Sequence, residues 1–142
     1  MSTYETDFYG WATEQANLLK SGRYGELDTA NLLEEIEGMG KSEKRALESR
    51  LAVLLQHLLK WQYQPVRRGK SWKLTIKEQR LRIEKILRDN PSLKRQLDSC
   101  LTDAYEFAII QAAQETGFDE TTFPNTCPWQ LQQILNNDFL PL

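Results

Sequence analysis

Apolar residues repeat at alternating steps of four and three along the middle of the chain, and this period constrains the fold more than any other feature. The clearest run consists of Leu47, Leu51, Leu54, Leu58 and Trp61. Steps of four and three place successive side chains on one stripe of an α-helix, and such a stripe packs against a neighbouring helix at a shallow angle. We therefore expect a long helix that starts after Ser42 and is stopped by Pro65.

The same helical period extends over most of the remaining chain. It predicts further helices over residues 7–22, 28–39, 71–90 and 90–117, and a short one from Pro128. The second of these is expected to end at a break around Gly38 and Gly40. No window alternates with the period of two that a strand requires. The sequence therefore predicts an all-α, up-and-down bundle of about five helices plus a short C-terminal helix, as one domain over residues 1–142.

The composition argues against secreted and membrane-spanning proteins. The first residues are acidic and lack the apolar stretch of a secretory signal. The longest apolar run, residues 51–59, is interrupted by Gln56 and His57 and is far shorter than a membrane span. Cys100 and Cys127 are expected to be reduced thiols, as in a reducing compartment. We expect a soluble, cytoplasmic protein.

Charge is distributed very unevenly along the chain. Residues 60–95 carry 12 of the 18 Lys and Arg but only 3 of the 20 Asp and Glu, whereas residues 98–142 contain no Lys or Arg. Such a separation usually has a partner, inside the fold or outside it. A helical projection places many of the basic residues on the outer face of the helix over 70–88, together with two leucines. The candidate interface residues are Lys73, Leu74, Lys77, Arg80, Leu81 and Lys85.

This mixture of lysine and leucine favours a protein partner. Exposed leucines gain little on a nucleic acid duplex, whereas a leucine fully buried by another helix contributes about 1.5–3 kcal/mol. The sequence therefore predicts a non-enzymatic helical interaction module that binds an acidic surface of a second copy or of another protein.

The alternative is a nucleic-acid-associated protein that uses the basic stretch 67–88, with Arg67, Arg68 and Lys70 as anion contacts. Trp61 and Trp72 flank the loop over residues 64–70 and are interpreted as core residues.

No catalytic, cofactor or metal site is predicted. Glu34, Glu35 and Glu37 would lie roughly 15 Å along the axis from His57 if their helices formed a hairpin at Gly40. No serine or cysteine has a general base at a sequence spacing typical of a catalytic pair. Gln79 occupies an inward position of its helix, roughly level with His57. We expect these two side chains to form a buried hydrogen-bonded pair.

Five ordered sequence blocks carry a family resemblance. They are Tyr4-Glu5-Thr6-Asp7-Phe8 with Trp11 and Gln15-Ala16; Asn31-Leu32-Leu33-Glu34-Glu35-Ile36-Glu37; His57-Leu58-Leu59-Lys60-Trp61 with Gln64-Pro65; Ser71-Trp72 with Gln79-Arg80; and Phe123-Pro124 with Cys127-Pro128-Trp129. Together they resemble the bacterial family catalogued as domain of unknown function 29, which is common in cyanobacteria. The resemblance implies an all-α domain of about this length. It implies no activity and supplies no catalytic or binding residues.

Overall fold

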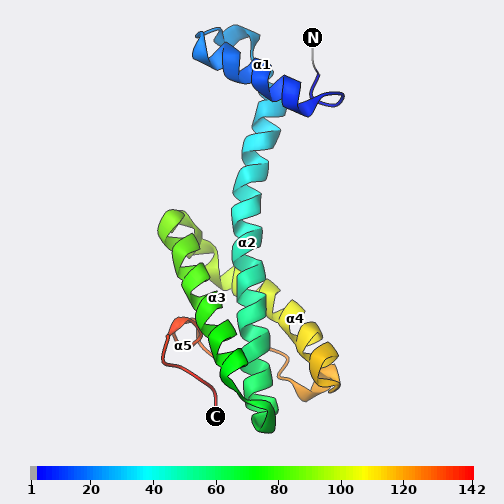
Figure 1. The fold of residues 1–142 in the computed structure, drawn as a ribbon, viewed down its shortest axis with the longest axis vertical. Helices are drawn as coiled ribbons and strands as arrows, with labels where there is room; N and C mark the ends of the chain where they lie inside the picture. Colours follow the sequence, from blue (N-terminus) through cyan, green and yellow to red (C-terminus); the bar gives the residue numbers. More distant parts are fainter. Residues whose placement is uncertain (1–2) are drawn as a thin grey trace. The chain divides into compact units, whose positions relative to one another are not determined.

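The computed structural model describes residues 3–142, and within this range it contains helices and connecting segments but no strand (Figure 1). The prediction of an all-α helical bundle is therefore confirmed. The α-helices are α1 (Phe8–Lys20), α2 (Thr29–Tyr63), α3 (Lys70–Asp89), α4 (Leu97–Thr116) and α5 (Leu131–Leu135).

The chain forms two compact units. The N-terminal unit extends to Ser42, and the C-terminal unit comprises Glu43–Leu142. Helix α2 contributes its first turns to the N-terminal unit and its remaining turns to the C-terminal unit.

The predicted break at Gly38 and Gly40 is wrong, because α2 is one continuous helix of 35 residues. A glycine inside a helix costs only about 1 kcal/mol relative to alanine, which does not by itself end a helix. A glycine that ends a helix commonly adopts a positive φ. Among the glycines of residues 3–142, only Gly22 (74°) and Gly117 (77°) do so, after α1 and α4. The two predicted helices are therefore one helix.

In the N-terminal unit, a hydrogen-bond network attaches α1 to the start of α2. Trp11 Nε1 and Asn31 Nδ2 donate to Asp28 Oδ2 at 2.9 and 2.8 Å, and the backbone N–H of Asp28 donates to Gln15 Oε1 at 2.8 Å. The bonds from Asn31 and Trp11 lower the pKa of Asp28. Trp11 and Gln15 are buried. Trp11, Gln15 and Asn31, which belong to the first two sequence blocks, therefore connect α1 to α2 through Asp28.

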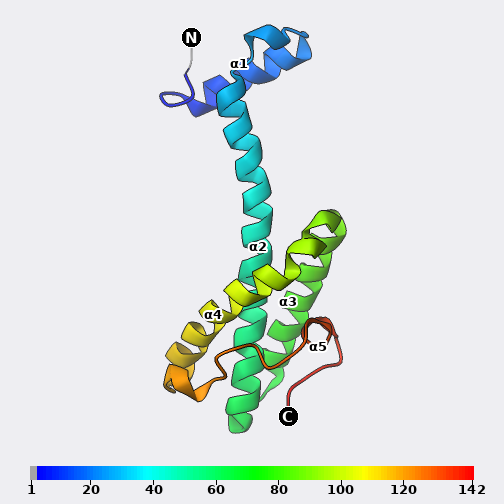
Figure 2. The same ribbon diagram turned by 180° about the vertical axis from the view of Figure 1, so that it is seen from behind.

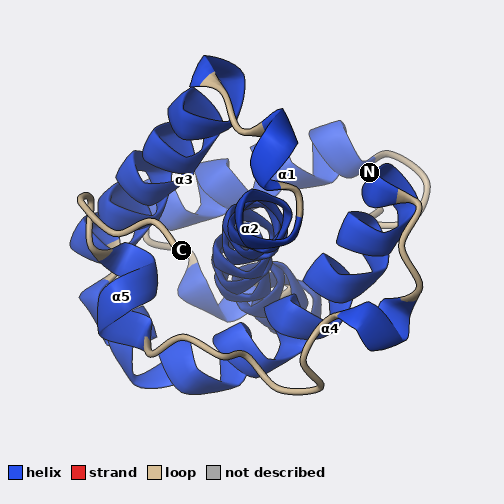
Figure 3. Ribbon diagram, turned by 90° about the horizontal axis from the view of Figure 1, so that it is seen from below, coloured by secondary structure: helices blue, strands red, loops and turns tan. Residues whose placement is uncertain are grey.

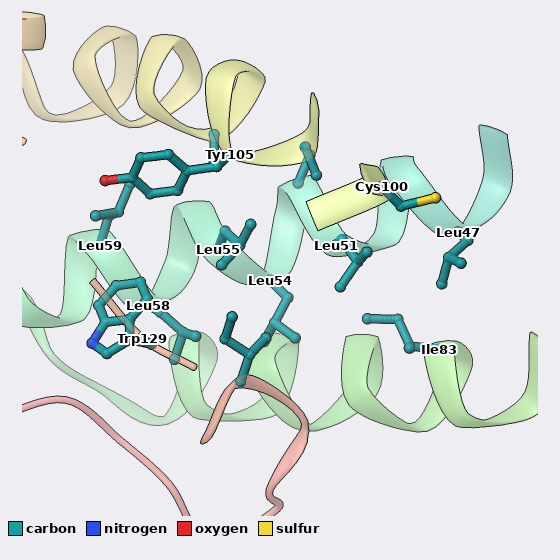
Figure 4. Packing of buried hydrophobic residues seen from close by; sticks show 14 of the residues in the cluster. Leu47, Leu51, Leu54, Leu55, Leu58, Leu59, Ile83, Cys100, Tyr105 and Trp129 are labelled. Atoms are coloured by element: carbon teal, nitrogen blue, oxygen red, sulfur yellow. The ribbon is translucent and has the colours of Figure 1, made fainter. Parts of the chain in front are cut away.

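The core of the C-terminal unit surrounds the second part of α2. Helix α2 runs between α3 and α4, and α5 lies beside α3 (Figures 1, 2 and 3). Figure 4 shows the leucines of α2 between Tyr105 of α4 on one side and Ile83 of α3 on the other. Because helices cover α2 on more than one side, its buried surface is wider than the predicted stripe. The fully buried leucines are Leu47, Leu51, Leu54, Leu55, Leu58 and Leu59.

The segment after α4 packs onto this core without forming a long helix. The Tyr105 hydroxyl donates to the Pro124 carbonyl at 2.7 Å, and the Tyr63 ring meets Phe123 edge to face, with 5.2 Å between the ring centroids. Trp129 is also buried. The short C-terminal helix begins at Leu131 rather than at Pro128.

We expect Gly38→Ala and Gly40→Ala each to stabilise the N-terminal part of α2 by about 0.5–1 kcal/mol. A Cβ at either position meets nothing within 4 Å, and neither glycine has a positive φ. Amide hydrogen exchange of residues 34–44 measures the effect. The control is Gly22→Ala, whose φ of +74° makes the change destabilising, by roughly 1–2 kcal/mol. Faster exchange in the Gly38 and Gly40 variants would contradict a continuous helix.

Candidate protein-interaction surface on helix α3

The outer face of α3 combines exposed lysines with half-exposed leucines. Leu74 and Leu81 are 53% and 52% exposed, and Lys73, Lys77 and Lys85 are exposed. At about 100° per residue these five side chains fall on one side of the helix, and the two leucines lie about 10 Å apart along its axis. We call this surface the lysine–leucine face. It contains five of the six candidate interface residues.

Arg80, the sixth candidate, does not belong to this face. Only 4% of Arg80 is exposed. Its Nε donates to the Ile134 carbonyl and its Nη2 to the Phe139 carbonyl, both at 2.8 Å. Burial lowers the pKa of Arg80, and Asp138 acts in the opposite direction. The prediction for Arg80 is wrong because the residue attaches the C-terminal segment to α3.

The positive charge of α3 is not neutralised by the acidic C-terminal segment. The ion pairs of α3 are local, between Arg82 and Glu78 at 3.6 Å and between Lys85 and Asp89 at 3.9 Å. Within Glu43–Leu142, no carboxylate of residues 98–142 forms an ion pair with a basic residue of α3. Lys73 and Lys77 therefore present their charge to the solvent, and Lys85 pairs only with Asp89 of its own helix.

Two grooves border the α3 helix. One, of about 450 Å³, lies between the lysine–leucine face and the C-terminal segment, where Lys77 and Leu81 meet Asp138 and Leu140. The other, of about 490 Å³, lies beside the second half of α3 and is lined by Ile83, Leu87, Arg88, Lys94 and Leu135 among others. The lysine–leucine face is therefore continuous with a recess that an incoming side chain can enter.

The three candidate anion contacts have different environments. Arg67 and Lys70 are exposed. Arg68 is half-buried: its Nε donates to the Trp61 carbonyl at 2.6 Å, and its guanidinium carbon lies 5.2 Å from the centroid of the Trp61 ring. Trp61 itself is only 7% exposed, as its interpretation as a core residue predicts. Arg68 therefore contributes to the fold, and the Trp61 ring has little surface on which a base could stack.

The predicted pair between Gln79 and His57 does not form. His57 Nδ1 bonds the Val53 carbonyl of its own helix at 2.8 Å, and the Oε1 atom of the buried Gln79 has no hydrogen-bond partner. His57 instead interacts electrostatically with Lys60 and with Glu115 of α4, and burial lowers its pKa. The prediction was wrong because being level along the two helices does not bring the side chains together, and His57 is directed toward Glu115 of α4.

The sequence interpretation missed an exposed apolar pair on α4. Phe107 and Ile110 are 62% and 43% exposed, and the exposed carboxylates Asp103 and Glu106 lie beside them. At 100° per residue these four side chains share the side of α4 opposite its buried residues. We call them the acidic–apolar face. A helical projection of residues 97–116 could have revealed it, because Phe107 and Ile110 fall outside the buried stripe.

Residues 3–142 hold neither a metal-binding cluster nor a membrane-spanning helix. No group of three or more His, Cys, Asp or Glu side chains there is arranged to hold a metal ion. None of the helices in that range is both long and apolar enough to cross a membrane.

We expect Arg80→Met to lower the free energy of unfolding by about 2–3 kcal/mol, because the Ile134 and Phe139 carbonyls lose a charged donor. Urea-induced unfolding measures the change. The matched control is Lys77→Met on the outer face of the same helix, for which we expect a change within about 0.5 kcal/mol. Equal small effects of both substitutions would contradict the anchoring role of Arg80.

Comparison with known proteins identifies the family. The chain matches no curated protein and no solved structure. The family model described as "Domain of unknown function DUF29" matches residues 3–140, which include all five sequence blocks. The resemblance noted from those blocks is thereby confirmed. This chain belongs to the DUF29 family.

Proposed function

We propose that this chain is a helical protein–protein interaction domain that self-associates through the lysine–leucine face of α3. One observation carries the proposal: Leu74 and Leu81 stand half-exposed among lysines that no carboxylate of residues 98–142 neutralises. A surface of this kind gains from an apolar partner that also carries negative charge.

A second copy of the chain can supply such a partner. Outside residues 60–95 the sequence carries 17 of its 20 Asp and Glu but only 6 of its 18 Lys and Arg. Two copies therefore offer each other surfaces of opposite sign. Such complementarity accelerates encounter and selects the orientation of the complex more than it raises affinity.

The apolar contribution of the face sets the expected strength of association. Leu74 and Leu81 are already about half-buried in one copy. Covering the rest contributes on the order of 1 kcal/mol for each leucine. A micromolar complex requires about 8 kcal/mol, so the remainder must come from neighbouring contacts and from charge. We therefore expect a moderate association that weakens as salt screens the lysines.

Nucleic acid binding is the second candidate. It is favoured by the exposed Arg67 and Lys70 and by a shallow cleft of about 420 Å³ at the start of α3, which Lys73 also lines. The half-exposed leucines and the contact of Arg68 with Trp61 argue against it. Phosphate contacts require a steep loss of affinity as salt rises. Salt-sensitive binding to a short DNA duplex, without self-association, would favour this candidate.

We expect the double substitution Leu74→Asp and Leu81→Asp to lower the average mass of the protein at concentrations where the unchanged chain associates. Sedimentation equilibrium over a range of concentrations measures this mass. Both leucines are half-exposed, so the fold should persist, and circular dichroism verifies it. The control is Val66→Asp, at a 94% exposed position outside the face. Unchanged association of the double variant, or a wild-type monomer at every concentration, would contradict the proposal.

A further inference from the structure

We infer that the lysine–leucine face of one copy docks on the acidic–apolar face of α4 in a second copy. The inference rests on the proposed function and adds the surface that receives α3. The contact between copies therefore joins two different faces of the chain.

The two faces are complementary in charge and in apolar content. The face on α3 presents two leucines among three lysines, and the exposed Glu84 lies on the same side of the helix. The face on α4 presents Phe107 and Ile110 beside Asp103 and Glu106. No Lys or Arg occurs between residues 98 and 142, so α4 supplies no positive charge that would repel the lysines. Docking therefore buries apolar surface from both helices and brings ammonium groups to carboxylates.

A groove beside Phe107 provides a second, independent observation. This groove has a volume of about 370 Å³ and lies between α2 and α4, with Ala52 and Val53 in its wall and the charged side chains of Arg45 and Glu48 beside them. Gln111 also lines it, and the buried Oε1 atom of Gln111 has no hydrogen-bond partner. A leucine of an incoming α3 can enter the apolar part of this groove beside Phe107.

The arrangement of the C-terminal unit prevents the two faces from meeting within one copy. Helix α2 lies between α3 and α4 (Figures 1 and 3). The helical projections place both faces on sides of α3 and α4 away from their buried residues. The attraction between the faces can therefore be satisfied only between copies. Contact between two α3 faces is disfavoured, because it would place lysines against lysines.

A contact between two different faces leaves one of each unused at the ends of the complex. Such a heterologous contact continues into an open chain or closes into a ring, whereas an isologous contact stops at the dimer. We therefore expect the mass at high concentration to exceed that of a dimer. A mass that saturates at the dimer would mean either two reciprocal α3–α4 contacts or an α3–α3 contact, and charge reversal on α4 separates these because it weakens only the first.

Charge reversal tests the pairing directly. We expect Lys73→Glu with Lys77→Glu, and separately Asp103→Lys with Glu106→Lys, each to weaken association at least tenfold. An equimolar mixture of the two variants should associate again, because the native α4 face of the first meets the native α3 face of the second. Sedimentation velocity of each variant and of the mixture measures this, with circular dichroism to confirm folding.

Glu34→Lys with Glu37→Lys is the matched control, because it makes the same charge change at two exposed residues of the N-terminal unit. We expect it to leave association unchanged. If association of the α3 variant is weakened but the α4 variant associates like this control, the receiving surface lies elsewhere. The inference then fails while the proposed function stands. If neither variant regains association in the mixture, the inference also fails. A wild-type chain that never associates overturns the proposed function as well.

Discussion

The burial of the α2 leucines is the interaction on which the C-terminal unit depends. Leu47, Leu51 and Leu58 are among six leucines with no exposed surface, and replacing any one by alanine is expected to cost about 2–5 kcal/mol. To cover them, α3 and α4 must each turn their inner faces toward α2 from different sides. Their outer faces are then held apart. The same packing that stabilises the unit therefore keeps the exposed lysines of α3 away from Asp103 and Glu106 on the outer side of α4, whereas the buried Lys60 of α2 pairs with Glu115 of α4.

Arg80 lies beside the surface lysines in sequence, but its role differs from theirs. Its guanidinium binds the carbonyls of Ile134 and Phe139, and the C-terminal segment is thereby fixed along α3. The neighbouring Lys77 remains exposed. A buried arginine that bonds backbone carbonyls contributes to stability, whereas an exposed lysine contributes mainly to encounter and orientation. One basic segment therefore serves both the fold and the proposed interface.

Helical stripes were predicted well, whereas the helix break at Gly38, the exposed face of α4 and the contacts with distant residues were not. The helical period predicted the stripe of α2 and the exposure of Leu74 and Leu81, because periodicity is a property of neighbouring residues. The burial of Arg80 depends on carbonyls more than 50 positions away, and sequence spacing does not reveal them. Gly38 suggested a helix break, but α2 continues through this residue. The face around Phe107 was missed because an aromatic residue in a helix is usually assigned to the core.

In the proposed complex, α3 of one copy contacts α4 of another. Carbodiimide coupling of an equimolar mixture of ¹⁴N- and ¹⁵N-labelled chains tests it most directly, since this reagent joins a lysine to a carboxylate only when the two are in contact. We expect mixed-isotope cross-links from Lys73 or Lys77 to Asp103 or Glu106. Cross-links from these lysines only to carboxylates outside α4, or only within one chain, would contradict it.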